Sequence, residues 1–275
     1  MKNIFEVAVC QMLVTESKER NIDNAVEMLE IAAENGAQLA LLPEMFICPY
    51  NSSLFSLYAE NMESSKTLSA ISNIAKKHNM YIAAGSIPEK YEDHLFNTCF
   101  VFDAKGNIIG RHRKTHLFDI DIPGKITFKE SDSLSAGDNI TVVDTEYCKI
   151  AVAICYDIRF PEFIRMAALK GAKLLVVPAA FNMTTGPAHW ELLMRTRALD
   201  NQLYIAAASP ARDETASYIA YGNSMIVDPW GMVLSRAGTG KEIIYMDIDL
   251  DEVEKIRMEL PLLKHRRTDI YSFNL

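Results

Sequence analysis

The amino-acid sequence predicts an α/β protein in which two similar halves form a four-layer α-β-β-α sandwich. Strand patterns and helix patterns alternate along the chain, which is typical of sheets that are covered by helices. From about residue 140 the pattern begins again, so that the second half repeats the first. If each half places its helices on one face of a sheet, the other faces are buried most simply by packing sheet against sheet.

Hydrophobic periodicity and turn residues predict the elements of the first half. Ile22, Val26, Leu29 and Ala33 fall on one face of a helix over residues 21–35, and Gly36 is a natural stop for it. In order, the first half is expected to contain a strand over 4–12, this helix, a buried strand over 39–46, a helix over 66–79, and strands over 81–87, 95–103 and 107–113.

The second half is preceded by a stretch with few structural signals. Residues 114–139 are expected to form a long loop, and loops of this length inside a compact fold are usually functional. A buried strand then ends near Ile154, and a helical pattern begins at Pro161. A helix-like run over 251–259 is followed by a C-terminal segment that could reach a partner subunit or fold back on its own sheet.

The repeat can be followed residue by residue. The segment MLEIAAENGAQLALLPEMF resembles FIRMAALKGAKLLVVPAAF without a gap, and YIAAGS (81–86) resembles YIAAAS (204–209). The matching positions are Gly36 with Gly171, Pro43 with Pro178, Asp103 with Asp228, and Gly106 with Gly231. No linker rich in Pro, Gly or Ser separates the halves, so we expect one domain over residues 1–275.

Composition narrows the classes of function. With 275 residues, of which 49% are hydrophobic, the chain can bury a full core. Its net charge of −8 argues against nucleic-acid or membrane partners, which need a dominant basic surface. The N-terminus reads as a strand and not as a signal peptide, because Glu6 interrupts its apolar stretch. Five cysteines without metal-ligand spacing favour free thiols in a reducing cytoplasm.

Three residues stand at positions where chemistry is plausible. Cys155 lies where a buried strand gives way to a turn before a helix, although a cysteine in an apolar strand is usually a core residue. Glu44 follows a strand end and becomes Ala179 in the repeat, so this carboxylate needs either a partner or a function. Lys114 ends the strand that runs into the long loop, within a basic cluster that could also be a solvated turn.

Together these residues resemble a known family. The glutamate of LLPEMF, the lysine of RHRKTHLFD and the cysteine of ICYDIRFPE are similar, in this order, to the Glu-Lys-Cys triad of the nitrilase superfamily of carbon–nitrogen hydrolases. The resemblance runs along the whole chain and implies the four-layer sandwich and a homodimer or larger assembly. The stretches KTHLFDIDIPGKITFKESDSLSAGD, FNMTTGPAHWELLMRTRALDNQ and SPARDETASYIAYGNSMIVDPWG most resemble the omega-amidases.

The resemblance implies a hydrolysis through a covalent thioester. In this hypothesis Cys155 attacks a side-chain amide after Glu44 takes its proton, and Glu44 then protonates the departing ammonia and activates the hydrolytic water. Lys114 and the backbone N–H of Tyr156 stabilise each oxyanion, and Lys114 should also favour the thiolate. The mechanism requires no metal and no cofactor.

Further residues are secondary candidates. Glu130 matches a second glutamate that the family places beside the triad lysine, and an exposed loop acid is its alternative. Arg159 could hold a substrate carboxylate, or it could pair with Asp157 or Glu162. Phe181 could line the pocket or be ordinary core. The two histidines of the family-like segments, His116 and His189, are read as structural.

The resemblance to omega-amidases implies short anionic substrates, namely α-ketoglutaramate, α-ketosuccinamate and succinamate. Three other functions remain open. Another branch of the superfamily would act on deaminated glutathione or on N-carbamoyl compounds, a true nitrilase would act on nitriles, and a non-catalytic scaffold would keep only the sandwich.

Overall fold

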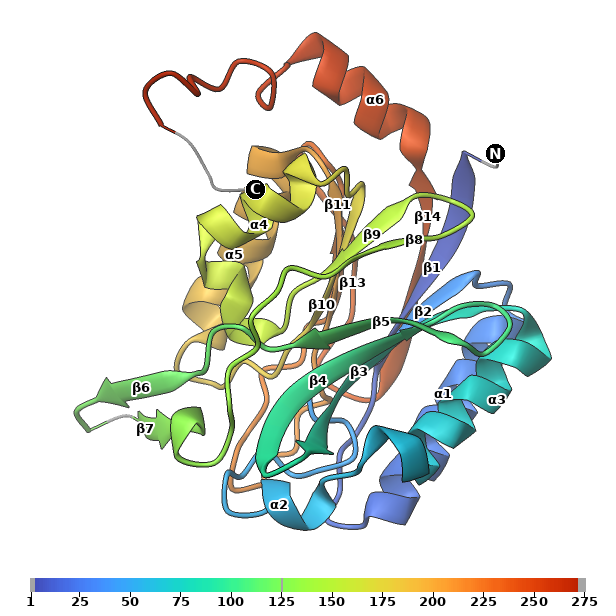
Figure 1. Ribbon diagram of the computed structural model, residues 1–275, viewed down its shortest axis with the longest axis vertical. Helices are drawn as coiled ribbons and strands as arrows, with labels where there is room; N and C mark the ends of the chain where they lie inside the picture. Colours follow the sequence, from blue (N-terminus) through green and yellow to red (C-terminus); the bar gives the residue numbers. More distant parts are fainter. Residues whose placement is uncertain (1–2, 125, 272–275) are drawn as a thin grey trace.

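The computed structural model describes residues 3–124 and 126–271, and within them two six-stranded sheets face each other (Figure 1). Helices α1 (Lys18–Glu34) and α3 (Lys66–His78) cover the outer face of the first sheet, whereas α4 (Pro161–Leu169) and α5 (Gly186–Asn201) cover that of the second. The expected four-layer α-β-β-α sandwich is therefore confirmed.

The two sheets have the same topology. The first has the order β14-β1-β2-β3-β4-β5 and the second β8-β9-β10-β11-β12-β13, when it is written from the matching edge. In each sheet three central strands are parallel and the outer strands are antiparallel. The strands of the first sheet are β14 (Glu242–Asp249), β1 (Ile4–Gln11), β2 (Leu39–Leu41), β3 (Tyr81–Tyr91), β4 (His94–Phe102) and β5 (Ile108–Arg113). Those of the second are β8 (Val142–Asp144), β9 (Lys149–Val152), β10 (Leu174–Pro178), β11 (Tyr204–Ala208), β12 (Met225–Val227) and β13 (Val233–Arg236).

The repeated turns confirm the internal repeat at atomic detail. Asp103 Oδ1 accepts hydrogen bonds from the backbone N–H groups two and four residues later, and Asp228 Oδ1 does the same. The glycines of these turns, Gly106 and Gly231, have φ of 82° and 84°. Because a positive φ is unstrained only for glycine, the same local chemistry gives the same turn in both halves.

The core is divided into clusters because side chains on each strand point alternately to the two faces of its sheet. On β1, Val7 and Val9 face the second sheet, whereas Ala8 and Cys10 face α1 and α3. Helix α1 buries Ala25, Met28, Leu29 and Ala32, with Ile22, Val26 and Ala33 at the margin of the same cluster. The buried face of α1 is therefore rotated by about one residue position relative to the face predicted from the sequence. The reason is that α1 packs against α3 as well as against the sheet.

Two expected elements differ from the structure. The strand predicted over 39–46 ends at Leu41, because Pro43 cannot donate to a sheet ladder and Met45 has a φ of 52°. The segment 114–139 is not a plain loop, since it contains the hairpin of β6 (Asp119–Ile122) and β7 (Ile126–Lys129) and the 3-10 helix Glu130–Asp132. In Figure 1 this hairpin projects away from the sandwich.

The remaining segments are short or terminal. A single-turn helix, α2 (Phe55–Tyr58), and the 3-10 helix Met62–Ser64 lie between β2 and α3. After α6 (Leu250–Glu259) the chain runs beside α4, where Arg165 interacts electrostatically with Arg266 and Tyr271 (Figure 1). The last four residues of the C-terminal segment lie outside the described residues. Within the described part of the chain, no helix has the length and apolar character that a membrane span requires.

Candidate active site

Three loops at the ends of strands bring Glu44, Lys114 and Cys155 into one buried cluster. Glu44 follows β2, Lys114 follows β5, and Cys155 begins the 3-10 helix Cys155–Arg159 that follows β9. Because β2 and β9 belong to facing sheets of the same topology, their carboxyl ends meet at one end of the sandwich. The three residues that resemble a triad therefore come together in space.

Lys114 lies between two carboxylates. Its Nζ is 2.9 Å from Glu44 Oε1 and 2.9 Å from Glu130 Oε1, and all three side chains are fully buried. Burial and both carboxylates act on this ammonium; the carboxylates prevail and raise its pKa well above the ordinary value. The structure thus places Glu130 beside Lys114, and its reading as an exposed loop acid is wrong.

The two oxygens of Glu44 differ in their partners. Oε1 accepts hydrogen bonds from Lys114 and from Asn97 Nδ2 at 2.8 Å, and the Tyr50 hydroxyl lies 3.2 Å away. Oε2 is buried and, apart from the Cys155 thiol, has no hydrogen-bond partner among the described residues. Burial raises the pKa of Glu44, although Lys114 opposes this. A carboxylate that is fixed by one oxygen and free at the other is suited to accept and return a proton.

The surroundings of Cys155 raise the pKa of its thiol well above the ordinary value and so favour the protonated form. Burial is the largest cause that raises its pKa, and the Glu44 carboxylate adds to it. Lys114 and the backbone N–H of Ala180 lower the pKa, but they do not prevail. Lys114 therefore favours the thiolate, as expected, but burial and the Glu44 carboxylate outweigh it. The thiol needs a base, and Glu44 is close enough for the thiol to lower the pKa of its carboxylate.

A buried acid holds the turn that carries Cys155. Cys155 has a backbone φ of 47°, a value that is strained for any residue other than glycine. Asp157 Oδ2 accepts from the backbone N–H of Ile154 at 3.0 Å, while His112 and His116 reach the same carboxylate at 3.1 Å and 2.7 Å. Burial alone would raise the pKa of Asp157, but the hydrogen bonds from the two histidines hold it well below the ordinary range. Asp157 therefore stays ionised and fixes the turn.

Arg159 lines a narrow pocket beside Cys155. Among the described residues it forms no ion pair with Asp157 or Glu162, so that alternative is wrong. Its guanidinium carbon lies 4.9 Å from the centre of the Phe181 ring, and Nη1 is 3.2 Å from His189 Nδ1. Phe181 is 3% exposed and lines the same pocket, so it belongs to both the core and the site.

Sequence reasoning missed three side chains of the cluster. Tyr50 donates to Glu130 Oε1 at 2.5 Å, Asn97 donates to Glu44, and Tyr218 stacks on Tyr50 with ring centres 4.6 Å apart. The sequence contained a signal for Asn97, because burying an amide side chain in an apolar strand costs free energy unless the amide has a hydrogen-bond partner. Tyr50 and Tyr218 lie in irregular segments, where no pattern points to the site.

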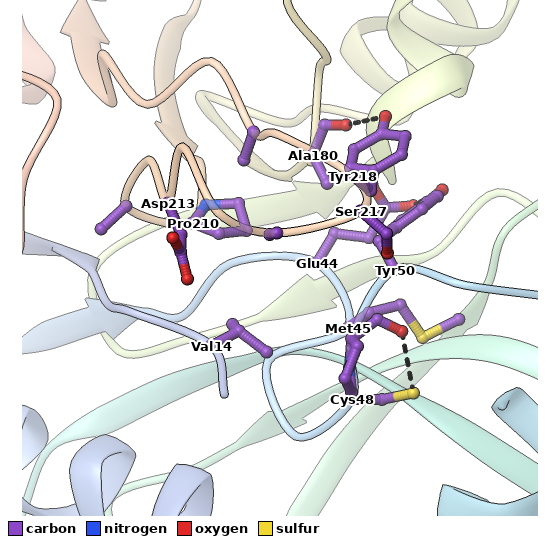
Figure 2. Close-up of a pocket in the computed structure, with 14 residues that line it drawn as sticks. Val14, Glu44, Met45, Cys48, Tyr50, Ala180, Pro210, Asp213, Ser217 and Tyr218 are labelled. Atoms are coloured by element: carbon purple, nitrogen blue, oxygen red, sulfur yellow. Dashed lines mark hydrogen bonds between the residues drawn. The ribbon is translucent and has the colours of Figure 1, made fainter. Parts of the chain in front are cut away.

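Two cavities adjoin the cluster, and Tyr218 and Ala180 line both of them. The pocket beside Cys155 is lined by Phe118, Cys155, Tyr156, Arg159, Ala180, Phe181, Thr185 and Tyr218, and contains about 10 Å³ of free space. The second cavity contains about 60 Å³ and is lined by Glu44, the segment 45–50 and the segment 210–220 (Figure 2). Because the first pocket is nearly filled, a substrate that binds there must displace lining side chains.

Comparison with known proteins agrees with this geometry. The family model of carbon-nitrogen hydrolases matches residues 6–258. The chain is 50% identical over 268 residues to the Omega-amidase NIT2 of Mus musculus, covering 98% of this chain and 97% of the relative. The Homo sapiens protein of the same name is 47% identical over 271 residues, with 98% of each chain covered.

Solved structures show the same relationship. Nit3 of Saccharomyces cerevisiae, described as a member of branch 10 of the nitrilase superfamily, superimposes with a TM-score of 0.88 at 40% identity, covering 96% of this chain and 97% of that one. The C. elegans NitFhit protein has a TM-score of 0.89 at 34% identity, covering 98% of this chain and 66% of that one. From its sequence, its fold and the buried Glu44, Lys114 and Cys155 cluster, the chain belongs to the carbon-nitrogen hydrolase family.

Proposed function

We propose that this protein is an omega-amidase, which hydrolyses the terminal amide of short dicarboxylic acid monoamides to the dicarboxylate and ammonia. The observation that carries the proposal is the placement of Arg159, a guanidinium without a carboxylate partner among the described residues, in the pocket that holds Cys155. An amide at the thiol would then have its free carboxylate at the guanidinium, which binds such groups through two parallel hydrogen bonds. The relatives named omega-amidase support the same substrate class.

The proposed reaction uses the buried cluster in two steps. Glu44 takes the proton of the Cys155 thiol while sulfur attacks the amide carbon, and the C–N bond breaks as Glu44 returns that proton to the departing ammonia. Glu44 next takes a proton from water, which attacks the thioester and releases the dicarboxylate and the thiol. Lys114 and the backbone N–H of Tyr156 stabilise the oxyanion in both steps, and Glu130 orients Lys114.

Ammonia release from a substrate panel tests this function. The panel contains α-ketoglutaramate, succinamate, deaminated glutathione, an N-carbamoyl amino acid and an aliphatic nitrile. We expect kcat/KM to be highest for the first two compounds. Preference for another compound would move the protein to a neighbouring branch of the family, and no turnover of any would favour a scaffold.

Arg159→Met is expected to remove the preference for anionic amides. The loss of a charge-assisted contact raises KM for succinamate by about 10–100-fold, corresponding to about 1.5–3 kcal/mol. KM for butyramide, which lacks the carboxylate, should change little. Arg20→Met, on the exposed face of α1, is the matched control. An equal effect of Arg159→Met on both amides would contradict the carboxylate role.

We also propose that the chain acts as one catalytic domain in a homodimer or larger assembly. Apolar side chains lie exposed on α5 and on the turn before β13, and Leu192, Trp230 and Met232 are more than half exposed. Leu192, Leu199 and Trp230 line one groove, and exposed apolar side chains that gather in this way are typical of a protein interface. The five free cysteines further support a reducing, cytoplasmic location.

Trp230→Asp is the corresponding test of assembly. A carboxylate placed in an apolar interface loses hydration without gaining a partner, so the assembly should dissociate towards monomers. Sedimentation velocity measures this, with Leu57→Asp at the exposed surface of α2 as the control. A sedimentation coefficient that is unchanged by Trp230→Asp would place the interface elsewhere.

A further inference from the structure

A second cavity is lined by the catalytic acid Glu44 but not by Cys155. We call it the Glu44 cavity. Fourteen residues line it, namely Val14, Glu44, Met45, Cys48, Pro49, Tyr50, Ala180, Pro210, Ala211, Asp213, Ala216, Ser217, Tyr218 and Ala220 (Figure 2). Its volume of about 60 Å³ holds more than one water molecule, since a single water needs roughly 10–15 Å³ of such space. The proposed substrate pocket contacts Cys155 and Arg159 instead.

Tyr218 is a shared wall residue of the two compartments. It lines both of them, its hydroxyl donates to the Ala180 carbonyl at 2.5 Å, and its ring stacks on Tyr50 (Figure 2). Burial raises the pKa of Tyr218 well above the ordinary value, so the hydroxyl remains a neutral donor. The backbone N–H of Ala180 interacts with the Cys155 thiol. One residue, Ala180, thus contacts both Tyr218 through its carbonyl and the reacting sulfur through its N–H.

Charge decides which molecules this cavity accepts. Its acidic lining groups are the carboxylates Glu44 and Asp213; Cys48, Tyr50 and Tyr218 have raised pKa values that favour their neutral forms, and most other walls are apolar. An anionic dicarboxylate is therefore repelled, whereas water and ammonia are small, neutral at the moment of transfer and able to hydrogen-bond to Glu44. The Cys155 thiol hydrogen-bonds to the Glu44 carboxylate, and Oε2, which has no other hydrogen-bond partner among the described residues, can also accept from such a molecule.

We propose that the Glu44 cavity holds the hydrolytic water and receives the departing ammonia, while the dicarboxylate chain stays in the pocket lined by Arg159. This inference rests on the proposed function. In the first half-reaction the C–N bond breaks, and the nitrogen takes its proton from Glu44 and moves into the cavity. In the second half-reaction a water from the cavity gives a proton to Glu44 and its oxygen bonds to the acyl carbon. The C–S bond then breaks and the sulfur recovers the proton.

The test fills the cavity without touching a reacting group. Ala216→Leu adds three carbon atoms to its wall, and Val14→Phe fills it from the other side if the first variant folds poorly. Ala104→Leu is the matched control, because it makes the same exchange at a residue of similar partial exposure. Ala104 lies in the turn between β4 and β5, at the end of β5 that is remote from Lys114. Thermal unfolding checks that each variant is folded.

The two half-reactions are separated with a p-nitrophenyl monoester of succinate. Its leaving group makes acylation fast, so the burst of nitrophenol reports acylation and the steady state reports hydrolysis of the thioester. For Ala216→Leu we expect a steady-state rate at least about tenfold lower, with a burst rate within about twofold of the wild type. Intact-mass spectrometry should show the succinyl-enzyme accumulating, and Ala104→Leu should behave as wild type.

Other outcomes overturn the inference. A burst that slows as much as the steady state would mean that the cavity holds part of the substrate chain, and a steady state within about twofold of the wild type would mean that water arrives elsewhere. Failure of the proposed function looks different. In that case the wild-type protein would release no ammonia from the short dicarboxylic monoamides, whatever the variants do.

Discussion

Cys155→Ala is expected to reduce amide hydrolysis by about 10⁴-fold or more, because the covalent route is lost and only binding and oxyanion donors remain. An amide is a poor electrophile with a poor leaving group, so a direct attack by water has no comparable path. The substitution removes only a sulfur atom from a residue that is 6% exposed, and the turn around it is held by Asp157. The fold should therefore be retained.

The measurement is kcat/KM for ammonia release from α-ketoglutaramate, with circular dichroism and thermal unfolding to confirm the fold. Cys99→Ala is the matched control, since Cys99 is a fully buried cysteine on β4 in the core between the sheets. It should destabilise the protein modestly and leave kcat/KM nearly unchanged. Wild-type ammonia release by Cys155→Ala would remove the thiol from the mechanism.

Lys114→Met is expected to abolish activity and to lower the free energy of unfolding by about 3–5 kcal/mol at pH 8, because it leaves two buried carboxylates without their common ammonium. Glu44 and Glu130 both lie 2.9 Å from Nζ and are fully buried. Without this cation their mutual repulsion and desolvation are no longer offset, and at least one of them must take up a proton.

The sign of the pH dependence follows from this charge. Burial raises the pKa of Glu44, and Lys114 is the chief group that lowers it, so Lys114→Met moves the folded-state pKa further upward. A raised carboxyl pKa means that the folded state binds more protons than the unfolded one. The loss of stability is therefore smallest near pH 4, grows as the pH rises towards the raised folded-state pKa, and is constant above it.

Urea unfolding of the variant and the wild type at pH 5 and pH 8 measures this difference. Adding Glu130→Gln to Lys114→Met removes one of the two carboxylates, so part of the stability should return while activity stays absent. Equal stability of Lys114→Met and the wild type at pH 8 would show that the cluster does not depend on this charge balance. The double variant separates a charge effect from a packing effect, since it changes little volume.

The local elements were predictable because short-range physical chemistry determines them. Gly36 and Gly171 have φ of 99° and 97°, which only glycine adopts without strain, so matching sequence positions reveal matching helix ends. The alternation on β1 likewise predicts a strand with two buried faces. The helix of the second half begins at Pro161, as expected from the preference of proline for the first turn of a helix.

The composition of the site was predictable only in part. Glu44, Lys114 and Cys155 could be found because each stands at a strand end and together they resemble a family. Tyr50, Asn97 and Tyr218 could not be found in this way, since they join the cluster through the packing of segments that are distant in the chain. No local pattern encodes that proximity, and the burial of Glu130 depends on it as well.

By itself, the sequence determined the repeated halves, the sandwich, the family resemblance and the three residues proposed to carry out the reaction, because local sterics and hydrophobic periodicity act over a few residues. Only the tertiary structure decided how these groups act on one another. It left Glu44 Oε2 without a partner other than the Cys155 thiol, raised the pKa of Cys155 by burial and made Tyr218 a wall of two compartments. The physical reason is that hydrogen-bond partners, desolvation and cavities depend on which side chains the packing of the two sheets brings together.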